Sequence, residues 1–150
     1  MQSAELKTEQ FRCEHCHSFS RTREVRFVDV RSDVDLRRRT KNFAVRIVKL
    51  YRSLPKTEEA RILGKQILRS GTSIAANYRA ACRARSRVEF IAKLGIVLEE
   101  SDETAFWLEL MQDAAIFPEA KLRDLVQEVN ELIAIFVASI RTTKGFTSAF

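Results

Sequence analysis

Glycine and proline are scarce in this chain of 150 residues, which contains only four Gly and two Pro. Proteins built from sheets with many turns usually need more of both. No apolar run approaches the roughly 18 residues of a membrane-spanning helix. The first twenty residues also lack the apolar region of a secretory signal. The odd count of three cysteines favours a reducing compartment over a disulfide framework. We therefore expect a cytoplasmic protein with no membrane partner.

Histidine is also scarce, because the only two, His15 and His17, lie in the segment Cys13–His17 (CEHCH). A CxxCH sequence is typical of haem attachment, which requires export, and the same side chains are able to bind zinc. Structural zinc sites usually draw a second pair of ligands from elsewhere, and here only the isolated Cys82 follows. We therefore expect no metal and no cofactor, with zinc as the alternative.

The lack of histidine in residues 18–150 excludes several kinds of active site. A di-iron bundle would need Glu-x-x-His pairs, and histidine general-base chemistry is excluded for the same reason. Glu99 and Glu103 stand four residues apart and could act as paired catalytic carboxylates. The alternative, which we adopt, is a hydrogen-bond network or subunit contact that sets helix register. Its members would be Ser70, Ser73, Asn77, Glu100 and Glu103. We expect no catalytic residue and no enzymatic activity.

Hydrophobic periodicity predicts four helices, over residues 34–53, 57–84, 86–115 and 118–144. The first ends before Pro55, because the residue that precedes a proline avoids helical angles. Thr57 caps the second, and Ser86 with Glu89 forms a capping box for the third. Pro118 suits a first helical turn, where its missing N–H costs nothing.

Each predicted helix carries apolar residues at spacings of three, four and seven, which places them on one face. In chain order these residues are Leu36, Phe43, Ile47, Leu50 and Leu54; Leu63, Ile67, Ile74, Tyr78 and Ala81; Phe90, Leu94, Val97, Leu108 and Met111; and Leu122, Leu125, Val129, Leu132, Phe136 and Ile140. The third seam also includes the polar Ser101 and Thr104. Gly64 and Gly71 share a face of the second helix and allow a neighbouring backbone to approach closely. The alternative is a break near Gly71.

Helices joined by such short links must run antiparallel to their neighbours. We therefore predict an all-α protein, an antiparallel up-down-up-down four-helix bundle over residues 34–144. Residues 1–33 have weak periodicity and are expected to be a poorly ordered N-terminal extension or a mis-called start. Residues 145–150 would form a short C-terminal tail.

Several sequence segments occur together in the predicted helices. They are RTKNFA (39–44), LPK (54–56), LRSGTSIAANYR (68–79), LEESDET (98–104) and WL (107–108). In this order they resemble the four-helix bundle proteins encoded in intervening sequences of bacterial 23S ribosomal RNA genes. The resemblance covers roughly residues 35–141. It implies a homo-oligomeric ring, a pentamer, and kinship with the accessory variability protein of diversity-generating retroelements, which binds nucleic acid and a reverse transcriptase. It also implies a chain start near Asp35.

Charge is distributed unevenly along the chain, whose formal net charge is +6. Residues 36–93 contain 16 Lys or Arg and three acids, whereas residues 94–150 contain four Lys or Arg and ten acids. A cationic surface neutralises phosphates and releases counterions, so we predict RNA or DNA binding without sequence specificity. The predicted nucleic-acid-binding residues are Arg37, Arg38, Arg39, Lys41, Arg46, Lys49, Lys65, Arg69, Arg79, Arg83, Arg85 and Arg87. The alternative is that this surface meets the acidic half of a neighbouring subunit, or another protein partner.

Overall fold

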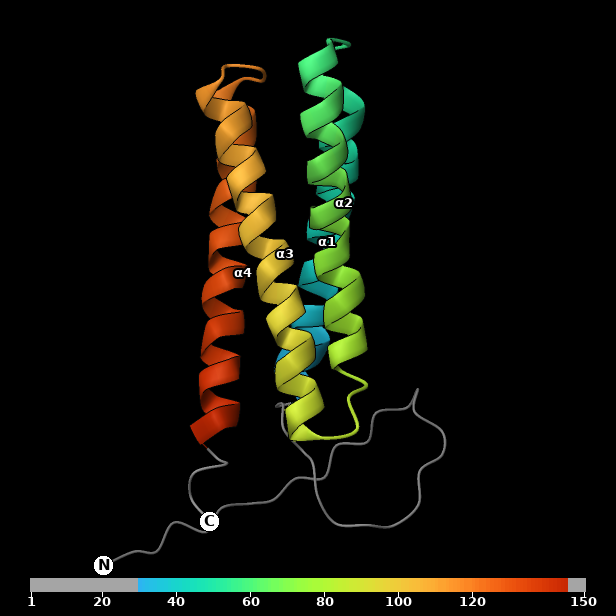
Figure 1. Cartoon of the computed structure of the whole chain (residues 1–150), viewed down its shortest axis with the longest axis vertical. Coiled ribbons are helices and arrows are strands. Elements are labelled where there is room, and N and C mark those ends of the chain that lie inside the picture. The colour runs from blue at the N-terminus through green and yellow to red at the C-terminus, as the bar shows by residue number, and fades with distance from the viewer. Residues whose placement is uncertain (1–29, 146–150) are drawn as a thin grey trace, which may run out of the picture.

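The computed structural model of the chain describes residues 30–145 (Figure 1). Its elements are α1 (Val30–Ser53), α2 (Glu58–Ala81), α3 (Arg87–Asp113) and α4 (Glu119–Gly145). No strand occurs in residues 30–145. The Cys13–His17 motif and most of the predicted extension lie outside the described residues.

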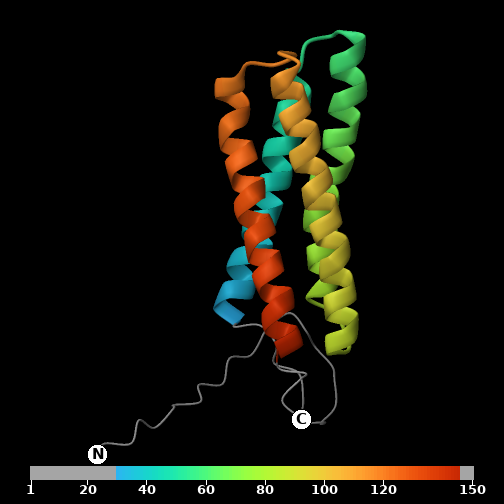
Figure 2. The ribbon, with the colours of Figure 1, turned by 60° about the vertical axis from the view of Figure 1, so that its left-hand side comes forward.

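The four helices form an antiparallel bundle. Links 54–57 and 114–118 lie at one end of it and link 82–86 lies at the other, so each helix reverses the direction of the last (Figure 1). Figure 2 shows that the axes of the four helices are roughly aligned. Each helix contacts the next one in the chain extensively, whereas α1 and α4 make far fewer contacts. The predicted all-α, up-down-up-down four-helix bundle is confirmed.

Local capping explains where α2 and α3 begin. The Thr57 hydroxyl accepts a hydrogen bond from the Ala60 N–H at 3.4 Å, and the Ser86 hydroxyl accepts one from the Glu89 N–H at 3.1 Å. The Glu89 carboxylate accepts in turn from the backbone N–H of Arg85 at 2.8 Å, a contact that lowers its pKa. The predicted capping box is therefore present, except that the Glu89 carboxylate accepts from the N–H of Arg85 rather than from that of the capping residue Ser86.

The ends of three helices differ slightly from the prediction. α1 begins at Val30 rather than Val34, and residues 30–34, which contain neither Gly nor Pro, are compatible with the extra turn. α2 ends at Ala81 and α3 at Asp113 rather than near Ala84 and Ala115. These are differences at helix termini, where the last turn is weakly determined by local sequence.

α3 ends in a Schellman motif that has alanine where glycine is usual. Ala115 has a φ of 52°, in the left-handed region. Its N–H donates to the carbonyl oxygen of Gln112 at 3.0 Å, and the Ile116 N–H donates to that of Met111 at 3.1 Å. Ile116 packs against the core, as the hydrophobic contact of this motif requires.

The predicted apolar seams meet inside the bundle. All seven seam positions of α3 are buried, including the polar Ser101 and Thr104. The buried core residues that were predicted from spacing are Phe43, Ile47, Leu50, Ile67, Ile74, Tyr78, Ala81, Phe90, Leu94, Val97, Leu108, Met111, Leu122, Leu125, Val129, Leu132 and Phe136. Leu36, Leu54, Leu63 and Ile140 are partly buried against this cluster. The periodicity therefore identified the inward face of each helix.

Gly64 and Gly71 allow α1 and α2 to approach closely. A Cβ added at Gly71 would lie 2.9 Å from Ile47 Cγ1, and one added at Gly64 would lie 2.5 Å from Leu54 Cδ1. Both glycines are buried and α2 runs through them without interruption, so the predicted single helix is confirmed and the break near Gly71 does not occur.

Candidate nucleic-acid interface

The predicted cationic residues occupy three parts of the bundle. α1 carries Arg37, Arg38, Arg39, Lys41, Arg46 and Lys49; α2 carries Lys65, Arg69 and Arg79; and the turn into α3 carries Arg83 and Arg85, with Arg87 as the first residue of α3. All are exposed except Arg37, Arg39 and Arg87, which are half-buried. Antiparallel packing of α1 against α2 brings the Arg79 end of α2 beside the start of α1, so cations distant in sequence share one surface.

Arg39 is held by carboxylates of α4. Its Nε donates to Glu128 Oε1 at 2.6 Å and its Nη2 donates to Glu128 Oε2 at 3.0 Å. The same Nη2 donates to Glu131 Oε2 at 2.5 Å. The hydrogen bond to Glu128 is the main reason that the pKa of Arg39 is raised. Hydrogen bonds from Gln127 and Arg39 lower the pKa of Glu131. Arg39 therefore joins α1 to α4 where the helices otherwise touch little.

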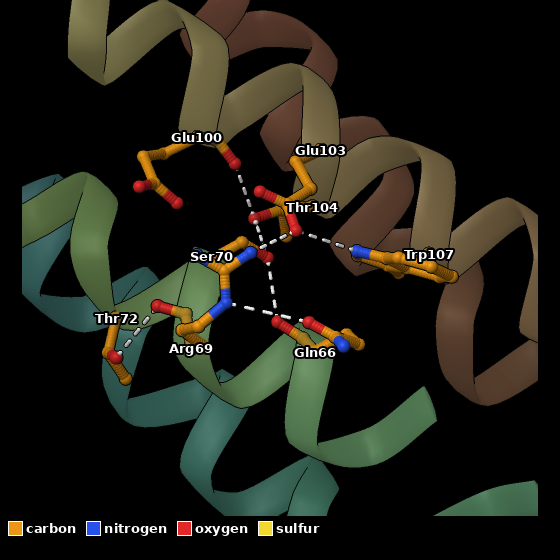
Figure 3. Close-up of polar contacts among 8 residues, drawn as sticks. All are labelled: Gln66, Arg69, Ser70, Thr72, Glu100, Glu103, Thr104 and Trp107. Atoms are coloured by element: carbon orange, nitrogen blue, oxygen red, sulfur yellow. Dashed lines mark hydrogen bonds and ion pairs between the residues drawn. The ribbon is translucent and has the colours of Figure 1, made fainter. Parts of the chain in front are cut away.

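Arg69 also forms an ion pair within the protein, between α2 and α3 (Figure 3). Its guanidinium pairs with Glu103, which also accepts a hydrogen bond from the Trp107 indole N–H at 3.1 Å. The bonds from Trp107 and Arg69 lower the pKa of Glu103. Arg38 pairs with Asp35 at 3.0 Å, one turn away on α1, and both of these side chains are mostly exposed. The Arg38 pair is therefore open to exchange, whereas Arg69 is tied to α3.

The Ser70 and Thr104 hydroxyl oxygens lie 2.9 Å apart across the α2–α3 seam, as Figure 3 shows. Both residues are fully buried, so this contact fixes how α2 and α3 align. Within the described residues, Glu100 Oε2 is buried and has no hydrogen-bond partner. Burial is the main cause of the raised pKa of Glu100. Of the residues predicted to form a polar network, Ser70 and Glu103 join α2 to α3, Ser70 through Thr104 and Glu103 through Arg69, while the Glu100 carboxylate takes no part in these contacts.

Seven of the other predicted cations form no ion pair with a carboxylate among the described residues. Those without an ion pair are Arg37, Lys41, Arg46, Lys49, Lys65, Arg79 and Arg83. Arg85 lies near Glu89, whose pKa its charge helps to lower. Most of the predicted cationic surface is therefore available to an external anion.

Two hollows follow each other along the junction of α1 and α2. The first has a volume of about 460 Å³ and is lined by Arg37, Arg38, Lys41, Ala75, Ala76 and Arg79. The second has a volume of about 360 Å³ and is lined by Lys41, Ala44, Val45, Val48, Lys49, Arg52 and Thr72. They share Lys41, and no carboxylate lines either of them. We call the two together the α1–α2 groove.

A third hollow lies on the other side of α1, and its charges are mixed. It has a volume of about 460 Å³ and is lined by Asp35, Arg38, Arg39, Asn42, Phe43, Arg46 and Glu128. Carboxylates at Asp35 and Glu128 repel an anion there, so this side of α1 is a poorer phosphate site than the α1–α2 groove.

Arg52 is a groove residue that the sequence-based prediction missed. It follows Lys49 by three positions, so the helical spacing that placed Lys49 on this face also places Arg52 there. Lys65 and Arg83 line neither hollow of the groove. The structure thus gathers Arg37, Arg38, Lys41, Lys49 and Arg79 into one groove and leaves the other predicted cations outside it.

Residues 30–145 contain no helix long and apolar enough to cross a membrane. They also contain no group of three or more His, Cys, Asp or Glu side chains placed to hold a metal ion.

The fold and the surface define a class of protein: a four-helix bundle with a cationic groove between its first two helices. The family described as 23S rRNA-intervening sequence protein matches residues 32–138, and the chain belongs to that family. A solved structure of a protein of unknown function from the S23 ribosomal protein family of Bacteroides thetaiotaomicron is similar, with 38% identity and a TM-score of 0.68. The match covers 73% of this chain and 97% of the other. No curated protein matches the chain.

Proposed function

We propose that this protein is a non-enzymatic, ring-forming four-helix bundle that binds RNA or DNA without sequence specificity through the cations that line the α1–α2 groove. The observation that carries the proposal is the α1–α2 groove, whose lining includes several cations and no carboxylate. Such a surface neutralises phosphates and releases their counterions. The family's name refers to 23S rRNA, which is a polyanion of the class that this surface would bind.

The absence of sequence specificity follows from the same chemistry. Contacts to phosphates set position and affinity, whereas base edges carry the sequence information. The groove lining offers Lys and Arg for phosphates, with small apolar residues and Thr72 between them, and it includes no Asn or Gln for bidentate pairing with adenine. We therefore expect similar affinity for oligonucleotides of unrelated sequence.

Two observations support a non-enzymatic role. Histidine is absent from residues 18–150, which leaves carboxylates as the main candidates for acid–base chemistry. Glu103 is occupied by Arg69 and Trp107, so it does not pair with Glu99 as a catalytic carboxylate would. The polar residues of this region join helices to each other.

Assembly into a ring draws support from the outward face of α3. Val88, Ile96 and Phe106 are large apolar side chains that are 76%, 46% and 54% exposed. Burial of such side chains against a neighbouring copy would remove apolar area from water. A contact between two different faces of one chain closes into a ring when the rotation permits it. A pentamer is the ring size that the resemblance to the family implies.

A salt titration tests nucleic-acid binding. A labelled oligonucleotide should shift in a gel at about 50 mM salt and lose the shift as salt rises to about 200 mM, because phosphate contacts are salt-dependent. No binding at the lower salt would refute the proposal. Light scattering of the protein alone measures the mass of the assembly, and a monomer at all concentrations would refute the ring.

The second candidate is an oligomeric scaffold, or a module for another protein, that does not bind nucleic acid. It is favoured by the exposed acids Glu99, Asp102 and Glu109 on α3, which complement the cations of α1 and α2. In that case high salt should dissociate the oligomer, and no oligonucleotide should bind at low salt.

A further inference from the structure

The α1–α2 groove has a shape that distinguishes between kinds of nucleic acid. Neighbouring helix axes lie roughly 8–10 Å apart, so the valley between them is narrow. Duplex DNA takes a protruding helix into its major groove of roughly 12 Å width. The α1–α2 groove is the opposite shape, because it is a hollow at the junction of two helices, with Arg37, Arg38, Lys41, Lys49 and Arg52 on α1 and Arg79 on α2. A duplex is too wide to enter such a hollow, whereas a single strand is narrow enough.

The uncharged residues that line the groove are small, and all of them except Thr72 are apolar. In the first hollow Ala75 and Ala76 lie among Arg37, Arg38, Lys41 and Arg79. In the second, Ala44, Val45 and Val48 lie among Lys41, Lys49 and Arg52. Alanine side chains leave room for a sugar or the face of a base, while the cations reach the phosphates on either side. Val45 is 45% exposed, so it offers apolar surface to a ligand in the groove.

The dimensions of the groove suit a short strand. Its cations run along α1 from Arg37 to Arg52, a rise of about 22 Å at 1.5 Å per residue. That distance corresponds to about six stacked nucleotides at 3.4 Å each. Each hollow also falls in the size range of roughly 300–1,000 Å³ that is typical of small-ligand sites.

We propose that the α1–α2 groove holds one strand of single-stranded RNA or DNA, with its phosphates on Arg37, Lys41 and Arg79 and its sugars and bases over Ala75 and Ala76. This inference rests on the proposed function and names the form of nucleic acid that the site takes. The groove lining includes no aromatic side chain, so base stacking contributes little and charge dominates the affinity.

The chain offers two matched sets of substitutions for a test. The groove variant combines Arg37→Gln, Lys41→Gln and Arg79→Gln. The control variant combines Arg46→Gln, Lys65→Gln and Arg83→Gln, which lie outside the groove and form no ion pair among the described residues. Each set removes two Arg and one Lys, so both variants have the same net charge.

Fluorescence anisotropy with labelled oligonucleotides of about 16 nucleotides measures the affinities. The wild-type protein should bind the single strand more tightly than a duplex of the same length. The groove variant should bind the single strand roughly tenfold more weakly at about 50 mM salt. The negative slope of log affinity against log salt concentration should become shallower by about 2, because three phosphate contacts are lost. The control variant should stay within about threefold of the wild type.

Several outcomes would overturn the inference, and they differ from failure of the proposed function. Equal losses in both variants would mean that binding is spread over the surface, and equal affinity for duplex would mean that the groove does not select a strand. A mononucleotide that binds as tightly as the oligonucleotide would mean a nucleotide pocket instead. Absence of any binding by the wild type at low salt would refute the proposed function itself.

Folding of the variants is checked separately. Gln is a good helix former, so the helical circular dichroism signal should be unchanged. A charge-retaining variant with Arg37→Lys and Arg79→Lys should keep most of the affinity of the wild type, because a point charge still reaches the phosphate. Loss of binding in this variant with its helices intact would contradict a site that works by charge.

Discussion

Substitution of Gly71 by alanine should destabilise the bundle although alanine is the better helix former. The added Cβ would lie 2.9 Å from Ile47 Cγ1, 3.0 Å from Cγ2 and 3.3 Å from Cδ1. Both γ carbons are bonded to the Cβ of a β-branched side chain, so a rotation about χ1 exchanges one close contact for another. Ile47 is fully buried, and relief therefore requires α1 to move away from α2.

Two effects of opposite sign set the magnitude. Alanine in place of glycine within a helix stabilises by roughly 0.5–1 kcal/mol. Overpacking of a well-packed core costs about 1–3 kcal/mol. The clash is direct and involves a side chain with little freedom, so the second effect should exceed the first. We expect a net loss of about 1 kcal/mol or more in the free energy of unfolding for Gly71→Ala.

Gly95 provides the matched control, because it lies within α3 and an added Cβ there meets nothing within 4 Å. Gly95→Ala should stabilise by roughly 0.5–1 kcal/mol. Gly64→Ala should fall between the two, since its closest contact, Leu54 Cδ1 at 2.5 Å, is the end of a flexible side chain. Urea denaturation followed by circular dichroism at one protein concentration measures all three. Equal stability of the Gly71 and Gly95 variants would refute the close packing of α1 on α2.

Three further predictions concern stability. Ala115→Gly should raise the thermal midpoint, because glycine adopts the left-handed conformation of this position without strain. The expected gain in the free energy of unfolding is about 1 kcal/mol, and a lowered midpoint would contradict the role assigned to this turn. A double-mutant cycle between Arg39→Met and Glu128→Gln should give a coupling of about 0.5–1 kcal/mol in denaturation, because both side chains are partly exposed; no coupling would mean that the pair does not hold α4. Glu100→Gln should remove one pH-dependent loss of stability: the folded protein binds the Glu100 proton more readily than the unfolded chain, so this carboxyl contributes a loss of stability as pH rises above its ordinary pKa of 4.5. The lowered pKa values of Glu103 and Glu131 contribute in the opposite direction, so the variant should gain stability relative to the wild type with rising pH. Thermal midpoints between about pH 4 and 8 measure that dependence, and parallel curves for the two proteins would exclude Glu100 as its source.

The site was less predictable than the fold. The sequence identified most of the cations of the α1–α2 groove, since their helical spacing places them outside the core. It did not show that Arg39 and Arg69 are held by carboxylates, because Glu128 lies 89 positions from Arg39 and Glu103 lies 34 positions from Arg69. It also missed Arg52, although the spacing from Lys49 contained the signal.

The sequence by itself determined the four helices, their caps and their buried faces. These properties depend on residues only a few positions apart: Thr57 and Ser86 cap the turns that follow them, and the seams repeat every three or four residues. The tertiary structure alone decided which cations stay available to a ligand and where a groove forms. Those properties depend on how helices rotate and align against each other, which is set by contacts such as Gly71 on Ile47 and Ser70 with Thr104.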